Sequence, residues 1–194
     1  MHDDLVKRAF TANQVDRLWL TDITEHPTAE GKLYLSAIKD ACSRRIVGYS
    51  MADRMTAKLA VDALHSAVLR RRPVATVVHS DRGSQFRSHA FVRVLRTHQL
   101  HGSMGRVGAC ADNAAMESFF SLLQKNVLNR RRWQTRQQLR LAIITWIENT
   151  YHRPTPAEQP RPAHTHRVRD TSISRDRGLT APTQTESTKV GADP

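Results

Sequence analysis

The sequence predicts a mixed α/β domain, in which one β-sheet carries helices on both faces. Two features of the chain lead to this prediction. Three β-rich segments follow one another in the N-terminal part, and strand-like segments then alternate with helix-like ones. None of the 194 residues belongs to an apolar run of about 18 residues, the length that a membrane-spanning helix needs. A globular fold without membrane spans is therefore expected.

The first three segments are predicted to be sequential antiparallel strands, at Arg17–Thr24, Lys32–Lys39 and Arg45–Met51. Each is rich in β-branched, aromatic and other apolar residues. The breaks between them contain Pro27, Gly31 and a turn at Asp40–Arg44. This pattern predicts that the N-terminal part of the chain supplies three adjacent antiparallel strands of the sheet.

Helices and strands alternate in the next part of the chain. From Thr56 apolar residues recur at helical spacing, and the basic run before Pro73 ends this helix. Val74–His79 is a short apolar run typical of a strand buried on both faces. Ser88 is predicted to cap a second helix, and Leu100–Met104 to form a last short strand. Two final helices are predicted at Asp112–Leu128 and Thr135–Tyr151.

The composition changes after Tyr151. Six of the eight prolines lie from Pro154 onward, among few large apolar side chains. Such a segment buries too little surface to offset its ordering entropy. We therefore predict a short lead-in at 1–16, a core at 17–151 and a disordered tail at 152–194.

The formal charge of +12 is concentrated in the predicted core, because residues 152–194 contribute only +2 of it. A basic excess of this size favours a polyanionic partner such as nucleic acid. A well-charged surface with no such partner is the alternative. Two cysteines, Cys42 and Cys110, are too few for a disulfide framework, and no signal peptide precedes them, so a reducing, cytoplasmic compartment is expected.

Three carboxylates occupy positions where a charge is unexpected. Asp22 alternates with Leu20 and so falls on the apolar face of its strand. Asp81 ends a buried strand and precedes Gly83, while Glu117 lies on a helix with a strongly apolar side. Each alone is explained equally well as a turn former or a solvated helix residue. Together they suggest hard oxygen ligands for a divalent cation, which would suit phosphoryl transfer.

Five segments occur in a recognisable order: Trp19–Thr24, Gly31–Leu35, Arg45–Ser50, His79–Gln85 and Asp112–Phe120. Together they resemble the catalytic core of bacterial insertion-sequence transposases of the integrase-like kind, which are related to retroviral integrases. Thirty-five residues lie between Asp81 and Glu117, which matches the spacing in that family. The resemblance covers residues 5–152 and implies a ribonuclease H-like fold.

The resemblance also implies the chemistry. Asp22, Asp81 and Glu117 would be the catalytic residues and would hold two Mg²⁺ or Mn²⁺ ions, with Asp22 bridging both. The implied activity is DNA cleavage and strand transfer, that is, DNA integration and transposition of an insertion sequence. The implied partners are the insertion-sequence ends and target DNA, bound by a homo-oligomer in the bacterial cytoplasm at the nucleoid. A non-catalytic DNA-binding remnant and a metal-dependent nuclease of the same fold are the alternatives.

Further residues are candidate DNA contacts. His79 shares a strand face with Asp81, and it either contacts phosphate or is a hydrogen-bonded structural histidine. Around the two acidic motifs the candidates are Gly83, Ser84, Gln85, Gln124 and Lys125. Many family members carry Lys at the position of Gln124. A basic cluster beside Trp133 is a candidate phosphate track, with solvated helix ends as the alternative; it comprises Arg130, Arg131, Arg132 and Arg136.

Both ends of the chain depart from the family pattern. The family has a helix-turn-helix-like segment before this core, and an Arg-rich stretch, then Leu-Gly and Pro, after it. Here Pro154 and Pro156 follow Arg153 instead. We therefore expect that an upstream DNA-binding part is missing before residues 1–16, and that the tail is out-of-frame translation. Translation of the other two frames after codon 153 tests this expectation.

Overall fold

The computed structural model describes residues 2–7, 9–105 and 114–152. The strands are β1 (Leu18–Thr28), β2 (Gly31–Asp40), β3 (Ile46–Ala52), β4 (Val77–Ser80) and β5 (His101–Met104). The helices are α1 (Ala57–Arg71), α2 (His89–Thr97), α3 (Ala114–Asn126) and α4 (Arg136–Trp146), with a 3₁₀-helix η1 (Leu128–Arg130) and a π-helix η2 (Ile147–Tyr151). The predicted order of strands and helices is confirmed.

The strands form one mixed sheet in the order β3-β2-β1-β4-β5. The pairs β1/β2 and β2/β3 are antiparallel, whereas β1/β4 and β4/β5 are parallel. The central strand β1 therefore has an antiparallel neighbour on one side and a parallel one on the other. The parallel ladder with β4 is short and places Leu20 opposite His79 at its end.

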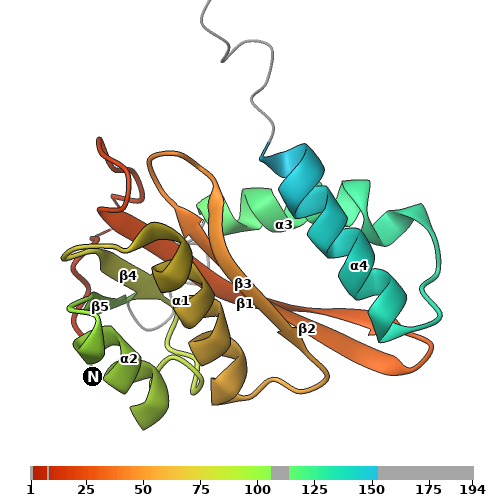
Figure 1. Ribbon diagram of the computed structural model, residues 1–194, viewed down its shortest axis with the longest axis horizontal. Coiled ribbons are helices and arrows are strands. Elements are labelled where there is room, and N and C mark those ends of the chain that lie inside the picture. The colour runs from red at the N-terminus through yellow and green to blue at the C-terminus, as the bar shows by residue number, and fades with distance from the viewer. Residues whose placement is uncertain (1, 8, 106–113, 153–194) are drawn as a thin grey trace, which may run out of the picture. The chain divides into compact units, whose positions relative to one another are not determined.

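Helices cover both faces of the sheet, as predicted (Figure 1). Alternation along β1 divides its side chains between two cores. Leu18 and Leu20 pack with residues of α3 and α4, such as Phe119 and Ile143. Trp19 lies on the opposite face and packs with residues of α1 and α2. No helix among the described residues is long and apolar enough to cross a membrane.

The first hairpin is longer than predicted. Pro27, expected in a break, lies within β1 opposite Lys32 of β2. This is possible because β4 pairs with β1 only as far as Leu20, so the outer part of β1 has one free edge. A proline is tolerated at such an edge because its missing N–H removes no ladder hydrogen bond there.

Other boundaries also differ from the prediction. Strand β4 begins at Val77 rather than Val74, because Val74 is 75% exposed and Ala75 takes a left-handed conformation with φ of 52°. The last predicted helix is α4 followed by η2. The predicted start of α3 at Asp112 lies outside the described residues, as does the tail predicted at 152–194 except for His152, which caps η2 at its C-terminal end.

Gly48 of β3 allows α1 to pack directly on the sheet. A Cβ atom at this position would lie 2.5 Å from both the Ala63 oxygen and the Ala67 nitrogen of the α1 backbone. Overpacking against backbone costs about 3 kcal/mol. We expect Gly48→Ala to lower the unfolding midpoint by about 6–12 °C, measured by thermal unfolding.

Gly102→Ala is the matched control for this prediction. The three atoms nearest to its Cβ would all belong to the ring of His2, the first at 2.5 Å, and a side chain near the chain terminus can move away. An unchanged midpoint in Gly48→Ala would contradict the close packing of α1 on β3.

Candidate active site

The register between β1 and β4 brings two of the predicted carboxylates to neighbouring positions. The parallel ladder ends where Leu20 lies opposite His79. Asp22 lies two residues beyond this pair on β1, on the same face of the strand as Leu20, and Asp81 lies two residues beyond it in the turn that follows β4. Both aspartates therefore lie just past the end of the β1–β4 ladder, where the central strands separate.

Asp22 is half-buried on the α3 face of β1. Its Oδ1 accepts a hydrogen bond of 2.7 Å from the backbone N–H of Ile23. Ala37 of β2 lies opposite it. The sequence thus places this carboxylate beside the apolar core formed by Leu18 and Leu20.

Asp81 lies in the turn that follows β4 and is exposed. Its Oδ1 accepts a hydrogen bond of 2.9 Å from the N–H of Gly83. A Cβ at Gly83 would lie 2.9 Å from this Oδ1 and 3.0 Å from Oε1 of Gln85, so glycine leaves room for both oxygens. The turn-forming role and a ligand role are compatible, because this hydrogen bond engages one of the two carboxylate oxygens.

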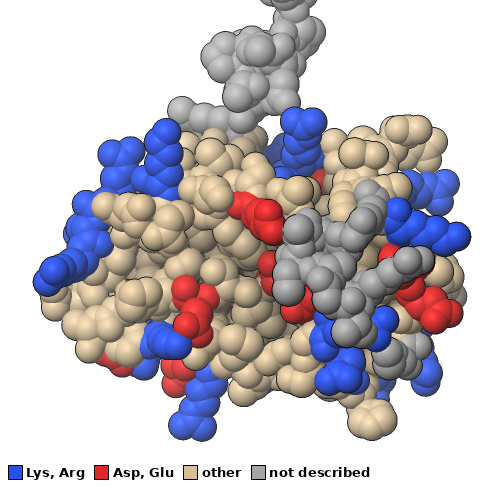
Figure 2. All heavy atoms as spheres, turned by 180° about the vertical axis from the view of Figure 1, so that it is seen from behind, with Lys and Arg blue, Asp and Glu red and all other residues tan. Residues whose placement is uncertain are grey.

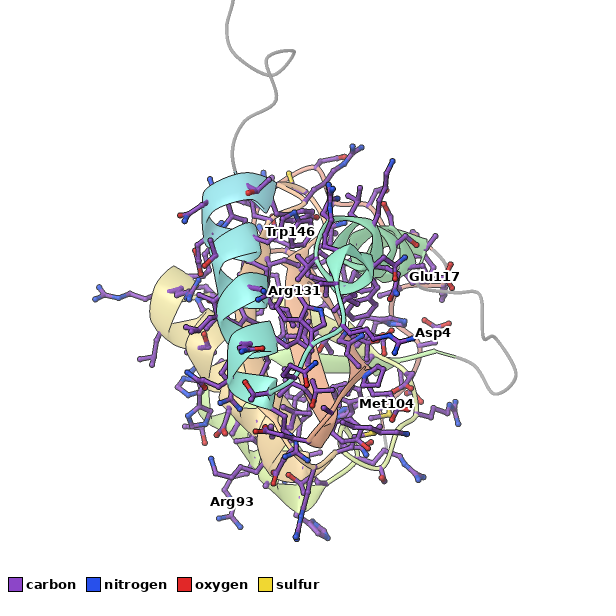
Figure 3. All side chains as sticks on the ribbon, turned by 90° about the vertical axis from the view of Figure 1, so that its right-hand side faces the viewer. Asp4, Arg93, Met104, Glu117, Arg131 and Trp146 are labelled. Carbon is purple, nitrogen blue, oxygen red and sulfur yellow. The ribbon has the colours of Figure 1, made fainter. Side chains whose placement is uncertain are left out.

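Glu117 is exposed in the first turn of α3 (Figure 3). Neighbouring side chains Met116, Phe119 and Leu123 are buried against the sheet and fix the orientation of the helix. Lys39 of β2, only 5% exposed, donates a hydrogen bond of 2.9 Å from Nζ to the Ala115 carbonyl. Burial lowers the pKa of Lys39. This bond joins the sheet to the part of α3 that carries Glu117.

The three carboxylates interact electrostatically. The pKa of Asp22 is raised from 3.8 to about 6, chiefly because burial disfavours its charged form. The hydrogen bond from Ile23 opposes this increase, whereas the negative charges of Asp81 and Glu117 add to it. The acidic residues that the sequence singled out are therefore near enough for their charges to interact.

The carboxylates are not arranged as a finished coordination sphere. Within residues 2–7, 9–105 and 114–152, no three His, Cys, Asp or Glu side chains form a group that could hold a metal ion. The chemistry of the donors nevertheless fits a hard cation, since Mg²⁺ prefers carboxylate oxygens. A cation beside Asp22 would also offset the repulsion from Asp81 and Glu117, which adds to the increase in pKa that burial causes.

His79 is a core residue. It is 4% exposed, its Nδ1 lies 3.0 Å from the Ser103 hydroxyl, and the ring of Phe10 packs edge-on at 5.5 Å. A side chain this deeply buried is not presented to a DNA phosphate at the surface. Of the two interpretations of His79, the structure favours the hydrogen-bonded structural histidine.

The other candidate contacts are more accessible. Ser84 is exposed and Gln85 is half-buried, with its Nε2 donating a 3.5 Å hydrogen bond to the Met55 carbonyl. On α3, Gln124 and Lys125 are both exposed. Gln124 donates a hydrogen bond of 2.5 Å from Nε2 to Oδ1 of Asn129.

The arginine cluster divides into two parts. Arg130, Arg131 and Arg132 are exposed, and the Arg131 guanidinium lies 4.3 Å from the centre of the Trp133 ring. Arg136 differs, because its Nε donates a hydrogen bond of 2.9 Å to the Lys32 carbonyl. It therefore holds the β1–β2 hairpin and is not part of the open basic surface. Figure 3 shows Arg131 on the segment that joins α3 to α4.

Two side chains near the site carry no motif in the sequence. Lys39 continues the alternation of Leu35 and Ala37 on an apolar face, and this pattern could have marked it as buried. His26 alternates with Asp22 on β1 and is 6% exposed. It lines a pocket together with residues of the segment between α3 and α4, and local sequence does not reveal that these two segments meet.

Comparison with known proteins places this arrangement in a wider context. Residues 12–110 match the family described as "Integrase core domain". The chain is 41% identical over 152 residues to the transposase InsF for insertion sequence IS3A of Escherichia coli K12, covering 78% of this chain and 53% of that protein. It is 38% identical over 145 residues to the transposase for IS629 of Shigella sonnei, covering 75% and 49%. The chain thus spans about half the length of the curated relatives it matches.

Solved structures share the fold. A chain of the simian T-cell lymphotropic virus intasome, solved in complex with PP2A regulatory subunit B56 gamma, matches with a TM-score of 0.63 at 17% identity, covering 89% of this chain and 62% of that one. The HTLV-2 integrase catalytic core domain, solved in complex with magnesium in a trimeric form, matches with a TM-score of 0.55 at 19% identity, covering 74% and 91%.

The mixed five-stranded sheet therefore shares its fold with these integrase structures. The chain belongs to the integrase core domain family. Its sequence relatives among bacterial proteins are transposases of insertion sequences.

Proposed function

We propose that this chain is the catalytic core of an insertion-sequence transposase that cleaves DNA and transfers strands with the help of divalent metal ions. One observation carries the proposal. The charges of Asp81 and Glu117 act on Asp22, whose pKa is raised to about 6 mainly by burial. Carboxylates held close together in this way repel one another unless a cation is present. Family membership supports the same conclusion.

The proposed reaction needs no protein nucleophile. Water or a DNA 3′-hydroxyl attacks the phosphorus of a phosphodiester in line, and the bond to the leaving 3′-oxygen breaks. Asp22, Asp81 and Glu117 would hold two Mg²⁺ or Mn²⁺ ions, with Asp22 shared between them. When bound, these ions supply positive charge to the attacking and leaving oxygens. The buried wall beside Asp22 limits access of water to one side of the site.

The DNA surface in this proposal surrounds the carboxylates. Phosphate contacts come from Gly83, Ser84 and Gln85 on one side, and from Gln124, Lys125 and Arg130–Arg132 along α3 and after it. On the face behind the view of Figure 1, Lys and Arg side chains lie mainly around the rim, and acidic side chains lie both near the middle and at the lower and right-hand edges (Figure 2). Basic side chains distributed in this way suit a polyanion that binds across the face.

The proposal extends to partners and place of action. The DNA partners would be the insertion-sequence ends and the target DNA, in the bacterial cytoplasm at the nucleoid. A homo-oligomer is proposed because two DNA ends must be brought together. Among the structural relatives, one is an intasome and another is described as a trimeric form.

A strand-transfer assay tests this function. The full chain is incubated with labelled DNA that ends in the terminal inverted repeat flanking the gene, and with a plasmid target. We expect labelled end joined to plasmid in MgCl₂ and none in EDTA. Cleavage without joining would identify a metal-dependent nuclease instead. DNA binding without either reaction would identify a non-catalytic remnant.

A further inference from the structure

A pocket lies between the β1–β2 hairpin and the segment that joins α3 to α4. Its volume is about 530 Å³, within the usual range for ligand sites. The walls that matter for recognition are His26, Gln124, Asn129, Arg131 and Trp133. We call it the hairpin pocket. The reaction proposed at the three carboxylates does not use the interior of this pocket, although Gln124 and Arg131 in its wall are also proposed DNA contacts.

The hairpin pocket continues the surface that begins at the carboxylates. His26 follows Asp22 by four residues on the same face of β1, a distance of about 13 Å along a strand. Gln124 follows Glu117 by two turns of α3, about 10 Å along a helix. The charge of Glu117 on α3 acts on Asp22 of β1, and Gln124 of α3 lines the same pocket as His26 of β1. The strand β1 and the helix α3 therefore run alongside one another from the acidic site to the pocket.

A second hollow lies along the same stretch of α3. It has a volume of about 550 Å³ and is lined by Phe120, Ser121, Gln124, Lys125 and Asn129. Two of these residues, Gln124 and Asn129, also line the hairpin pocket. The concave surface therefore extends back along α3 to within one turn of Glu117. A DNA strand that leaves the acidic site along α3 would reach the pocket after about three to four steps of 3.4 Å.

The polar groups of the pocket suit a neutral planar ligand. His26 is 6% exposed, and its Nε2 has no hydrogen-bond partner among the described residues. Burial lowers the pKa of His26 to about 4, so the ring is neutral at pH 7 and offers one donor and one acceptor. An unpartnered buried nitrogen is destabilising, and a ligand that supplies a hydrogen bond removes this penalty.

The side-chain amides of Gln124 and Asn129, which also line the hairpin pocket, together offer one hydrogen-bond donor and one acceptor as well. The hydrogen bond from Gln124 Nε2 to Asn129 Oδ1 leaves Gln124 Oε1 as an acceptor and Asn129 Nδ2 as a donor. A phosphate presents acceptors only, whereas the edge of a nucleobase presents donors and acceptors together. The guanidinium of Arg131, which lies over the Trp133 ring at 4.3 Å from its centre, adds a planar group on which a base can stack.

We propose that the hairpin pocket binds an unpaired nucleobase of the DNA substrate, about three to four nucleotides from the phosphodiester held at Asp22, Asp81 and Glu117. This inference rests on the proposed function, because it takes DNA as the substrate. It requires an opened DNA end, because a paired base could not enter the pocket. Arg131 and Arg132 would then hold the phosphates on either side of the bound base.

Abasic substitution tests the proposal, because it removes a base and keeps its phosphate. The probe is a set of terminal inverted-repeat duplexes, each with one abasic site at positions 1 to 8 from the cleavage point on either strand. Binding of the full chain is measured in EDTA, so that no cleavage accompanies it. We expect an abasic site at one position, near the third or fourth, to raise Kd about tenfold, the size of a base-stacking contribution.

Substitutions in the hairpin pocket test whether the pocket causes the increase in Kd at the abasic site. Gln124→Ala changes an exposed side chain, and His26→Phe keeps the ring volume but removes both hydrogen-bonding nitrogens; thermal unfolding checks that each is folded. Each variant should bind intact DNA more weakly and lose the penalty for the abasic site. Arg93→Ala is the control, because Arg93 is exposed on α2 away from the pocket (Figure 3), and it should keep the full tenfold ratio.

The possible outcomes separate this inference from the proposed function. Equal Kd values for all abasic duplexes overturn the nucleobase site, and so does an abasic penalty that persists in Gln124→Ala and His26→Phe. If Arg131→Gln weakens every duplex equally and no abasic position matters, the pocket is a phosphate site. Strand transfer by wild type with no abasic effect overturns this inference alone. Failure of wild type both to bind and to join DNA overturns the proposed function as well.

Discussion

Asp81→Asn and Glu117→Gln are each expected to reduce strand transfer at least about a thousandfold. Metal ions stabilise a phosphoryl-transfer transition state by several kilocalories per mole, and every 1.36 kcal/mol corresponds to a tenfold change in rate. Each substitution removes one negative charge and keeps the size of the side chain. The measurement is the rate of end joining in MgCl₂, with Mn²⁺ binding followed by titration calorimetry.

Neither substitution should unfold the protein. Both carboxylates are exposed, and Asn at position 81 keeps an oxygen that can accept the hydrogen bond from Gly83. Asp53→Asn is the matched control, because Asp53 is an exposed carboxylate just beyond β3. We expect wild-type activity and metal binding in that variant.

A variant that combines Asp81→Asn and Glu117→Gln shows whether the two residues serve one catalytic site or contribute independently to the rate of strand transfer. If Asp81 and Glu117 serve one catalytic centre, the combined loss should be far smaller than the product of the two single losses. Retention of a tenth or more of the wild-type rate in Glu117→Gln would remove this residue from the proposed metal ligands. Equal activity of wild type and Asp81→Asn would remove the catalytic assignment altogether.

Much of the fold could be predicted because the relevant interactions are local. Alternation along β1 assigns Leu18 and Leu20 to one face and Trp19 to the other, and the two cores are divided in this way. Helix ends are set by nearby residues as well. Ser88 was predicted to cap α2, and its hydroxyl accepts a 3.2 Å hydrogen bond from the Phe91 N–H.

The arrangement of the site depends on contacts between distant parts of the chain. The neighbouring positions of Asp22 and Asp81 follow from the β1–β4 register, which no local pattern specifies. Arg136 belongs to a basic run in the sequence, yet it bonds the Lys32 carbonyl of the hairpin. His79 likewise becomes a core residue because β5 supplies Ser103 beside it. The positions of these side chains depend on which distant segments of the chain come into contact, and only the complete fold determines those contacts.

Asp22→Asn is expected to stabilise the metal-free protein at pH 7.5, although it should abolish the proposed activity. The pKa of Asp22 is about 6 in the folded protein, against 3.8 ordinarily, so the folded state holds this proton more tightly than the unfolded state does. Between pH 4 and pH 6 the carboxyl therefore contributes less stability as the pH rises. Above pH 6 the full penalty is present, at about 2 kcal/mol after allowing for partial exposure.

His26 has the opposite pH dependence. Its pKa falls from 6.5 to about 4 on burial, so the unfolded state binds this proton more tightly, and stability is lost as the pH falls from 6.5 toward 4. In wild type the contributions of Asp22 and His26 therefore largely cancel across this range. Asp22→Asn removes one of them, and its unfolding free energy should fall more steeply on acidification than that of wild type.

Denaturant unfolding in EDTA at pH 4, 5, 6 and 7.5 measures both effects. The variant should exceed wild type by about 2 kcal/mol at pH 7.5, equivalent to about 4–8 °C in the unfolding midpoint, and the difference should approach zero at pH 4. Asp53→Asn should show no pH-dependent difference from wild type. A gain in Asp22→Asn that is the same at pH 4 and pH 7.5 would show that packing, and not the charge of Asp22, is responsible. If the charge is responsible, saturating Mg²⁺ should raise the stability of wild type and leave the variant unchanged, because a ligand stabilises only the folded state that binds it.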